Sequence, residues 1–158
     1  MDNRLFSLVS LGIFLFFLAV TVNTIMLSNA GAVSLKTQKL IVEWHDWAPQ
    51  IFNTAKQQQR LILLDITAKW CQFCRKMDDV TYKYPQVMNV IKQNFIAVRA
   101  DEANHPELVK RYKKAALPLT VVFDSNGNEI YKRSGYMKPQ WMAWTLMAVL
   151  PELVSDNK

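Results

Sequence analysis

Residues 61–66 form a short apolar run that only Asp65 interrupts, and the two cysteines of the chain, Cys71 and Cys74, follow it closely. So continuous a run is typical of a strand covered on both faces, in a sheet flanked by helices. A helical pattern begins directly after the cysteines and extends to about Asp79. We therefore expect an α/β domain in which both cysteines lie at the junction of a buried strand and a helix.

The segment before this strand has large and small apolar residues at three- and four-residue steps, namely Trp44, Trp47, Ile51 and Ala55. The spacing predicts a helix over residues 43–59 whose apolar face packs on the sheet. After the cysteines, residues 85–93 predict a further helix and residues 95–100 a second strand. This part of the chain therefore alternates helices and strands.

A further helix and a hairpin follow. Asn104 with Glu107 three residues later, and a proline in the first turn, predict that Asn104 begins a helix that extends to about Lys114. Strand-like residues 119–123 and 129–133 flank a turn that contains glycine, which predicts a β-hairpin.

The last predicted helix spans residues 138–150 and ends before Pro151. We expect its Trp141 and Trp144 to be core or packing residues. The complete order is helix, strand, helix, strand, helix, hairpin, helix. It predicts a central mixed sheet flanked by helices, parallel where helices cross over and antiparallel at the end.

The N-terminus differs from the rest, because the 23 residues from Leu5 to Leu27 carry no charge. As a helix with a rise of about 1.5 Å per residue they reach roughly 34 Å, enough to cross a hydrocarbon core of roughly 30 Å. A cleavable signal peptide is the alternative, because Arg4 precedes a short apolar core and small residues follow near Ala30.

Three parts of the chain follow from this. Residues 1–30 are expected to form one N-terminal hydrophobic helix, a membrane anchor or a signal peptide, residues 31–40 a linker, and residues 41–158 a single domain. The net charge of +6 belongs to the residues after position 30. Basic residues cluster only at 110–111 and 113–114, which favours a solvated helix face over a nucleic-acid site, so no nucleic acid is expected as a partner.

The position of the cysteines indicates redox chemistry more strongly than their spacing does. A helix N-terminus presents unpaired N–H groups and the positive end of the helix dipole, and both stabilise a thiolate over a thiol. Cys71 is therefore the expected nucleophile. Cys74 lies one helical turn further on, close enough to attack a mixed disulfide on Cys71.

Two other uses of a C-x-x-C pair stay open at this point. The same spacing supplies two metal ligands, and His45 and His105 bring the number of possible ligands to four, although they lie in distant segments. A purely structural disulfide is the other alternative, but it does not explain the strand-to-helix position. We favour dithiol chemistry and predict no metal site and no cofactor.

Two separate segments resemble the thioredoxin family. Residues 63–76 are similar to its strand, Trp-Cys-x-x-Cys motif and basic helix, and residues 117–123 with Asn126-Gly127 are similar to its cis-proline loop and hairpin. The resemblance covers about residues 41–151 and implies a thioredoxin-like fold. Within the family, residues 77–87 and the acidic loop at Asp101 look most like the C-terminal periplasmic domain of the bacterial transmembrane thiol:disulfide interchange reductase.

The resemblance implies roles for four residues: Cys71 attacks, Cys74 resolves, Asp65 is the buried acid beneath them, and Pro118 is the cis residue facing the disulfide. A buried carboxylate has a raised pKa, so Asp65 is suited to relay a proton to Cys74; a partly exposed strand end is the alternative. A cis Leu117-Pro118 bond leaves a main-chain edge free to pair with substrate, and an ordinary trans proline is the alternative.

Two aromatic residues flank the cysteines. We expect Trp70 to pack beside the cysteines and shield one side of the site, and Gln72 and Phe73 to tune the reduction potential. The alternative for Phe73 is a hydrophobic contact that anchors a protein partner. The two residues between the cysteines include no histidine, unlike the corresponding pairs of strong oxidants. The lack of a histidine at this place favours reduction over oxidation.

The sequence therefore predicts a thiol:disulfide oxidoreductase that reduces disulfides in exported proteins and is recharged by a membrane electron donor. The expected location is the inner membrane facing the periplasm, or the periplasm or exterior if the N-terminal segment is cleaved. A membrane-tethered peptide-binding adaptor or chaperone, with incidental cysteines, is one alternative. A metal-delivery protein that uses both cysteines is the other.

Overall fold

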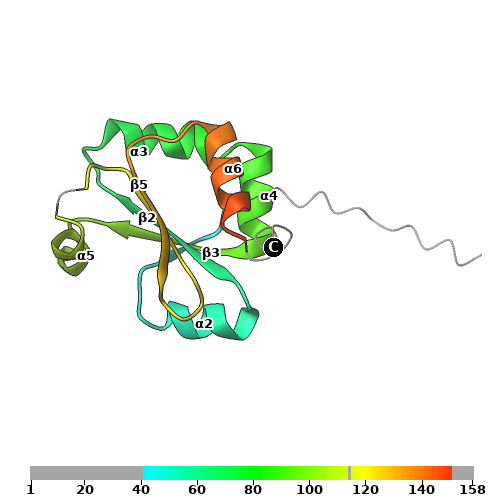
Figure 1. Ribbon diagram of the computed structural model, residues 1–158. Coiled ribbons are helices and arrows are strands. Elements are labelled where there is room, and N and C mark those ends of the chain that lie inside the picture. The colour runs from blue at the N-terminus through cyan, green and yellow to red at the C-terminus, as the bar shows by residue number, and fades with distance from the viewer. Residues whose placement is uncertain (1–40, 114, 151–158) are drawn as a thin grey trace, which may run out of the picture. The chain divides into compact units, whose positions relative to one another are not determined.

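The computed structural model describes residues 41–113 and 115–150 (Figure 1). Within these residues the strands form one sheet, with the spatial order β1-β3-β2-β4-β5. The strands are β1 (Trp44–Asp46), β2 (Leu61–Thr67), β3 (Phe95–Asp101), β4 (Leu119–Phe123) and β5 (Glu129–Ser134). The helices are α2 (Ile51–Gln58), α3 (Gln72–Lys76), the π-helical turn η1 (Met77–Thr81), α4 (Pro85–Asn94), α5 (Pro106–Arg111) and α6 (Pro139–Ala148).

The sheet is mixed, as the sequence predicts. β1, β3 and β2 are parallel, whereas β4 is antiparallel to β2 and β5 is antiparallel to β4. Parallel neighbours require a long crossover, which α3, η1 and α4 provide between β2 and β3. β2 is the central strand, and its residues 61–66 are all buried, which explains why the run is apolar at almost every position.

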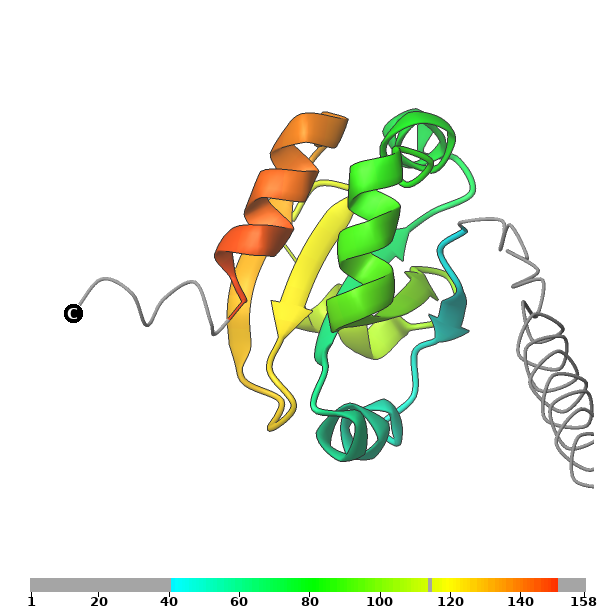
Figure 2. The ribbon, with the colours of Figure 1, turned by 90° about the vertical axis from the view of Figure 1, so that its right-hand side faces the viewer.

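Alternate residues of β2 enter two different cores. Leu61 and Leu63 pack with residues of η1, α4 and α6, whereas Ile62, Leu64 and Ile66 pack with residues of α2 and α5. Figure 2 shows α4 and α6 side by side over one face of the sheet. Asp65 is in step with Leu61 and Leu63, so its carboxyl faces the side where α3 and η1 lie.

The helix predicted over residues 43–59 is wrong at its N-terminal half. Trp44–Asp46 instead form β1 at the edge of the sheet, and the helix is limited to Ile51–Gln58. Pro49 explains the late start, because proline lacks an N–H donor and disfavours helical backbone at the residue before it. Trp44 and Trp47 pack against different cores, so their spacing does not mark one helix face.

The predicted strands over 95–100, 119–123 and 129–133 and the helix over 85–93 are confirmed. The predicted helix start at Asn104 is wrong, because α5 begins at Pro106 and no side chain caps it. The carbonyl of Asp101 accepts hydrogen bonds from the N–H groups of Asn104 and His105, at 3.0 and 3.1 Å. These bonds hold Asn104 in a turn that precedes the helix. The helix also ends at Arg111, before the predicted Lys114.

The two tryptophans of α6 are not core residues. Trp141 and Trp144 are 52% and 55% exposed, so the core part of the prediction that they are core or packing residues is wrong. Met142, Ala143 and Leu146 form the buried face of the helix instead. The guanidinium of Arg133 lies 5.5 Å from the ring centroid of Trp141, which gives that ring a partner on the surface.

The predicted N-terminal hydrophobic helix (1–30), the linker (31–40) and the last residues of the predicted domain (151–158) lie outside the described residues. Among the helices that the structure describes, none has the length and apolar character needed to cross a bilayer.

Candidate active site

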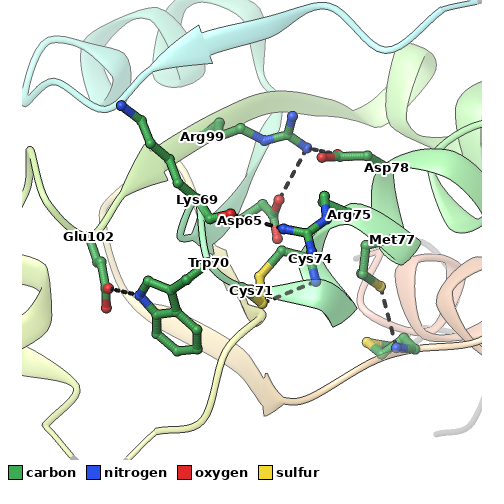
Figure 3. The surroundings of a disulfide bond; sticks show 11 residues. Asp65, Lys69, Trp70, Cys71, Cys74, Arg75, Met77, Asp78, Arg99 and Glu102 are labelled. Carbon is green, nitrogen blue, oxygen red and sulfur yellow. Dashed lines mark hydrogen bonds and ion pairs between the residues drawn. A yellow bond between two sulfur atoms is a disulfide. The ribbon is translucent and has the colours of Figure 1, made fainter.

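Cys71 and Cys74 lie where β2 gives way to α3, and they form a disulfide (Figure 3). Cys71 is the N-cap of α3, and its Sγ accepts a hydrogen bond from the N–H of Cys74 at 3.1 Å. Both residues are only 3% exposed. In the reduced protein the same N–H donor and the positive end of the helix would stabilise a thiolate on Cys71.

Local hydrogen bonds hold the turn that leads into the disulfide. The N–H of Cys71 donates to the carbonyl of Ala68 at 3.0 Å. The guanidinium of Arg75 donates to the carbonyl of Lys69 at 2.9 Å, so a side chain of α3 reaches back to the turn before it. These two bonds fix where Cys71 enters the helix.

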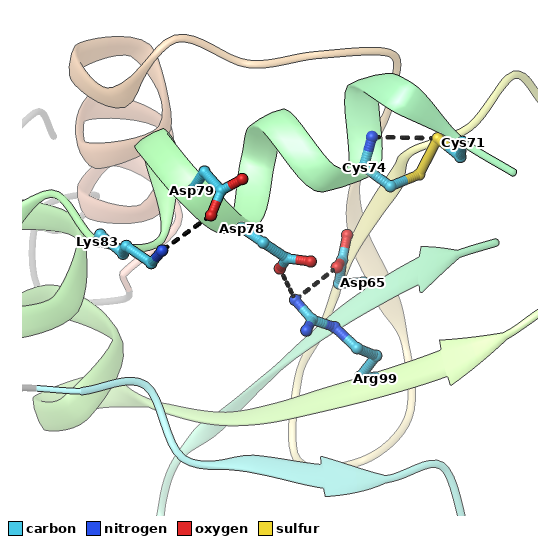
Figure 4. Close-up of polar contacts among 7 residues, drawn as sticks. All are labelled: Asp65, Cys71, Cys74, Asp78, Asp79, Lys83 and Arg99. Carbon is cyan, nitrogen blue, oxygen red and sulfur yellow. Dashed lines mark hydrogen bonds and ion pairs between the residues drawn. A yellow bond between two sulfur atoms is a disulfide. The ribbon is translucent and has the colours of Figure 1, made fainter. Parts of the chain in front are cut away.

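Asp65 is buried on the helix-covered side of β2, near the disulfide (Figure 4). The guanidinium of Arg99, its register partner on β3, donates to Asp65 Oδ2 at 3.2 Å. The same nitrogen of Arg99 also bonds Asp78, which belongs to η1. Arg99 therefore shares one cationic nitrogen between a buried and a half-exposed carboxylate.

Burial raises the pKa of Asp65 to about 6, in spite of the opposing charge of Arg99. The negative charge of Asp78 acts in the same direction as burial, and the pKa of about 6 is the net result of these effects. Three buried oxygens meet no hydrogen-bond partner among the described residues, namely Asp65 Oδ1, the hydroxyl of Tyr82 and the hydroxyl of Thr120. Thr120 is the register partner of Asp65 on β4, and the burial of Asp65 on the central strand favours the protonated form of its carboxyl.

Arg99, Asp78 and Tyr82 are site residues that the sequence analysis did not identify. The Arg99 guanidinium lies 4.0 Å from the ring centroid of Trp44 and 5.8 Å from that of Tyr82. Strand register brings Arg99 to Asp65, and register is not visible in the sequence of β3 alone. The sequence could have indicated Asp78, because it lies four residues after Cys74 on a helical stretch, and residues four apart lie on the same helix face.

Trp70 directly precedes Cys71. Its side chain is exposed, and its Nε1–H donates to Glu102 Oε1 at 2.6 Å (Figure 3). Glu102 follows β3, and its N–H donates to the carbonyl of Thr67 at 2.9 Å. The indole is thus held at the rim of the site by a residue from the neighbouring strand.

Phe73 lies exposed beside the disulfide, between Cys71 and Cys74 in the chain. Its ring is 6.4 Å from that of Tyr136, and the ammonium of Lys76 is 4.8 Å from the Tyr136 centroid. Phe73, Tyr136 and Lys76 form an aromatic and cationic rim on the side of α3.

The Leu117–Pro118 peptide bond is cis. Leu117 packs against the small cluster of Ala68, Cys71 and Cys74, which brings this loop to the disulfide. The carbonyl of Pro118 accepts a hydrogen bond from the N–H of Gly135 at 2.8 Å. The loop is therefore tied to the end of β5, with Leu117 on the cysteine side.

The histidines are placed apart from any ligand cluster. His45 lies in β1, and His105 precedes α5 with its Nδ1 3.1 Å from Glu107 Oε1. Across residues 41–113 and 115–150, no group of three or more His, Cys, Asp or Glu side chains is arranged to hold a metal ion.

Part of the chain is similar to two kinds of longer protein. It is 32% identical over 79 residues to the thiol:disulfide interchange protein DsbD of Yersinia pestis, which is 48% of this chain and 13% of that protein. It is 25% identical over 71 residues to spermatogenesis-associated protein 20 of Rattus norvegicus, which is 45% of this chain and 9% of that protein. The matched region thus spans only about a tenth of these relatives.

Solved structures share the fold. A thioredoxin from Thermus thermophilus superposes with a TM-score of 0.63 at 16% identity, over 74% of this chain and 93% of that one. A structure described as DsbH oxidoreductase gives 0.57 at 19% identity, over 70% and 87%. The reduced C-terminal domain of DsbD from Neisseria meningitidis gives 0.52 at 22% identity, over 62% and 89%. The chain therefore has a thioredoxin-like fold.

A family model described as "Protein of unknown function, DUF255" (Thioredox_DsbH) matches residues 24–155, which is most of the chain. Together with the fold and the disulfide at the start of α3, this match places the protein in the thioredoxin family, close to DsbD-like domains. The chain belongs to the DUF255 (Thioredox_DsbH) family.

Proposed function

We propose that this protein is a protein-disulfide reductase, in which Cys71 and Cys74 pass electrons to disulfides of exported proteins. The observation that carries the proposal is a disulfide at the N-terminus of α3, with the buried carboxyl of Asp65 nearby. A structural disulfide would not require a carboxyl with a pKa of about 6 in the same buried region.

The reaction proceeds in two exchanges. The Cys71 thiolate attacks one sulfur of the substrate disulfide, a mixed disulfide forms on Cys71, and one substrate thiolate leaves. Cys74 then loses its proton, and its thiolate attacks Cys71 Sγ, which forms the Cys71–Cys74 disulfide and releases the second substrate thiolate. Two electrons reach the substrate, and two protons complete its thiols. A dithiol donor then reduces the protein again.

Asp65 serves the second exchange. Its pKa of about 6 lies close to neutral pH, so the carboxylate accepts the proton of Cys74 and gives it up again without a large energetic penalty in either direction. Arg99 and Asp78 act through Asp65, because one cationic nitrogen serves both carboxylates.

The rim residues bind the substrate. Trp70 and Phe73 are exposed aromatic side chains on either side of Cys71, and such residues are frequent anchors in protein interfaces. Leu117 packs against the cysteine cluster and Pro118 follows it, so an extended substrate segment can lie along this loop.

Three observations support an exported, reducing role. The 23 uncharged residues from Leu5 to Leu27 are typical of a membrane anchor or signal peptide. No histidine stands between the cysteines to stabilise a thiolate as imidazolium does. The similarity to the thiol:disulfide interchange protein DsbD supports disulfide-containing protein substrates, and we propose a membrane electron donor as the source of electrons.

Trapping of the mixed disulfide tests the assignment of attacking and resolving thiols. We expect the Cys74→Ser variant to accumulate a covalent complex with a disulfide-containing substrate, because the resolving thiol is missing. The Cys71→Ser variant should form none. Non-reducing electrophoresis with mass spectrometry of the linked peptide measures both. A Cys71→Ser variant that keeps full function would instead favour a peptide-binding adaptor.

A further inference from the structure

A basic cavity lies between α5 and β5, away from the disulfide itself. It has a volume of about 500 Å³ and is lined by Lys110, Arg111, Tyr112, Lys113, Ala115, Lys132 and Ser134. Four of these residues are cations and none is an acid. A concave surface lined by one sign of charge concentrates the opposite charge at its mouth.

Only part of this positive charge is neutralised within the protein. Glu129 pairs with Lys132 at 2.9 Å and lies 3.7 Å from Arg111, and it accepts a hydrogen bond from Tyr112 at 2.9 Å. Neither Lys110 nor Lys113 forms an ion pair with any residue in the described part of the chain. Among the described residues, one carboxylate therefore pairs with two of the four cations, and the cavity is left with a surplus of positive charge.

A second cavity connects this basic region to the active-site rim. It has a volume of about 170 Å³ and shares Tyr112, Lys113 and Ala115 with the first. Its other lining residues are mostly apolar and include Leu117, which packs against the cysteine cluster, and Glu102, which holds Trp70. The surface thus leads from the disulfide, across an apolar stretch, to the basic cavity.

We propose that the basic cavity binds an acidic segment of the polypeptide whose disulfide Cys71 attacks. This inference rests on the proposed reductase function and adds a preference in substrates, namely Asp or Glu residues on the side of the substrate cysteine that passes Leu117. An extended polypeptide fits this surface because the apolar stretch separates the anionic end from the reacting sulfur. A small anion would fill the basic cavity without touching that stretch.

Two disulfide peptides test the preference. They share one sequence around the cystine, but one carries Asp and Glu where the other carries Asn and Gln. With the full chain in a neutral detergent, we expect a roughly tenfold lower KM for the acidic peptide at low salt, a difference that shrinks in 0.5 M salt, and the same kcat for both. Equal KM values at low salt would overturn the proposal and leave the reductase function intact.

Charge-reversal variants test whether the basic cavity causes the preference for the acidic peptide. Lys113 borders both cavities, so Lys113→Glu should remove most of the difference between the peptides while KM for the neutral peptide and both kcat values stay unchanged. Lys110→Gln should remove part of it. Lys56→Glu makes the same charge change on the exposed surface of α2 and is the matched control. If Lys56→Glu weakens the preference as much as Lys113→Glu, the effect is one of net charge and the proposal is wrong.

A binding measurement separates the proposal from the redox chemistry. A cysteine-free acidic peptide should bind the oxidised protein, with affinity lost in Lys113→Glu, even if neither disulfide peptide is reduced. In that case the reductase function fails and the binding surface stands. If inorganic phosphate at the same concentration displaces the peptide completely, the cavity is a small-anion site and the polypeptide proposal is overturned.

Discussion

Asp65 occupies a position where an ionised carboxylate is destabilising. It is 2% exposed on the central strand, and its Oδ2 has one cationic neighbour, Arg99, that is shared with Asp78. Burial prevails over that attraction and raises the pKa of the carboxyl to about 6. Ionised Asp65 therefore lowers the stability of the fold, and we attribute its presence to its proposed role in the reaction. Such a loss of stability in favour of activity is common at catalytic sites.

The pH dependence of stability should reveal this carboxyl. The folded protein keeps the proton of Asp65 up to about pH 6, whereas the unfolded chain releases it near its ordinary pKa of 3.8. The ionised form therefore weakens folding progressively between pH 4 and 6 and fully above that range. Asp65→Asn removes this ionisable group, so relative to the wild type it should raise the unfolding free energy more at pH 8 than at pH 3. We expect the increase at pH 8 to exceed the increase at pH 3 by roughly 3 kcal/mol.

Urea unfolding at the two pH values measures this difference. Asp79→Asn is the matched control, because Asp79 is exposed and pairs with Lys83 across one helical turn. The effect of Asp79→Asn on the unfolding free energy should be small at both pH values, because an exposed ion pair contributes little to stability. A gain from Asp65→Asn that is the same at pH 3 and pH 8 would show that the carboxyl is not perturbed by burial.

Among the elements, β2 and the β4–β5 hairpin could be predicted from the sequence. A continuous apolar run marks the buried strand, and a turn that contains glycine marks the hairpin, and both patterns are local. The start of α2 could not be predicted, since tertiary pairing of β1 with β3 and Pro49 together overrode a helical spacing. The exposure of Trp141 and Trp144 was equally hidden, because α6 has apolar residues on nearly every side and its sequence does not say which face meets the sheet.

Two buried hydrogen bonds tie the π-helical turn η1 to Met137 in the loop before α6, and in one of them the N–H of Met137 donates to Met77 Sδ at 3.4 Å. Thr81 Oγ1 donates to the carbonyl of Met137 at 2.7 Å, and both residues are buried. Thr81→Val should lower the unfolding free energy by about 1–3 kcal/mol, because the carbonyl is left without its donor in a buried place. Thr54→Val, which removes an exposed 3.4 Å bond to the carbonyl of Gln50, is the control and should change it by less than about 0.5 kcal/mol. Equal losses in the two variants would mean that the buried bond has no special weight.

At the scale of the whole molecule, the sequence predicted the reacting pair but not its surroundings. Cys71, Cys74 and Asp65 lie on one continuous segment, so a strand followed by a helix was enough to bring them together. Arg99 and Glu102 reach the site only through the pairing of β3 with β2. The sequence predicts that the basic residues of α5 form a solvated helix face. In the structure Lys110 and Arg111 of this helix line a cavity together with Lys132 and Ser134 of β5.

The equilibrium reduction potential of the Cys71–Cys74 pair, measured in the full chain against glutathione, tests the central claim most directly. A reductase must hold its dithiol at a potential below that of the proteins it reduces. We therefore predict a value near that of thioredoxin, about −270 mV, with Asp65→Asn shifting the pH dependence of that potential. A value near −120 mV, as in strong oxidants, would contradict the reducing function proposed for this site.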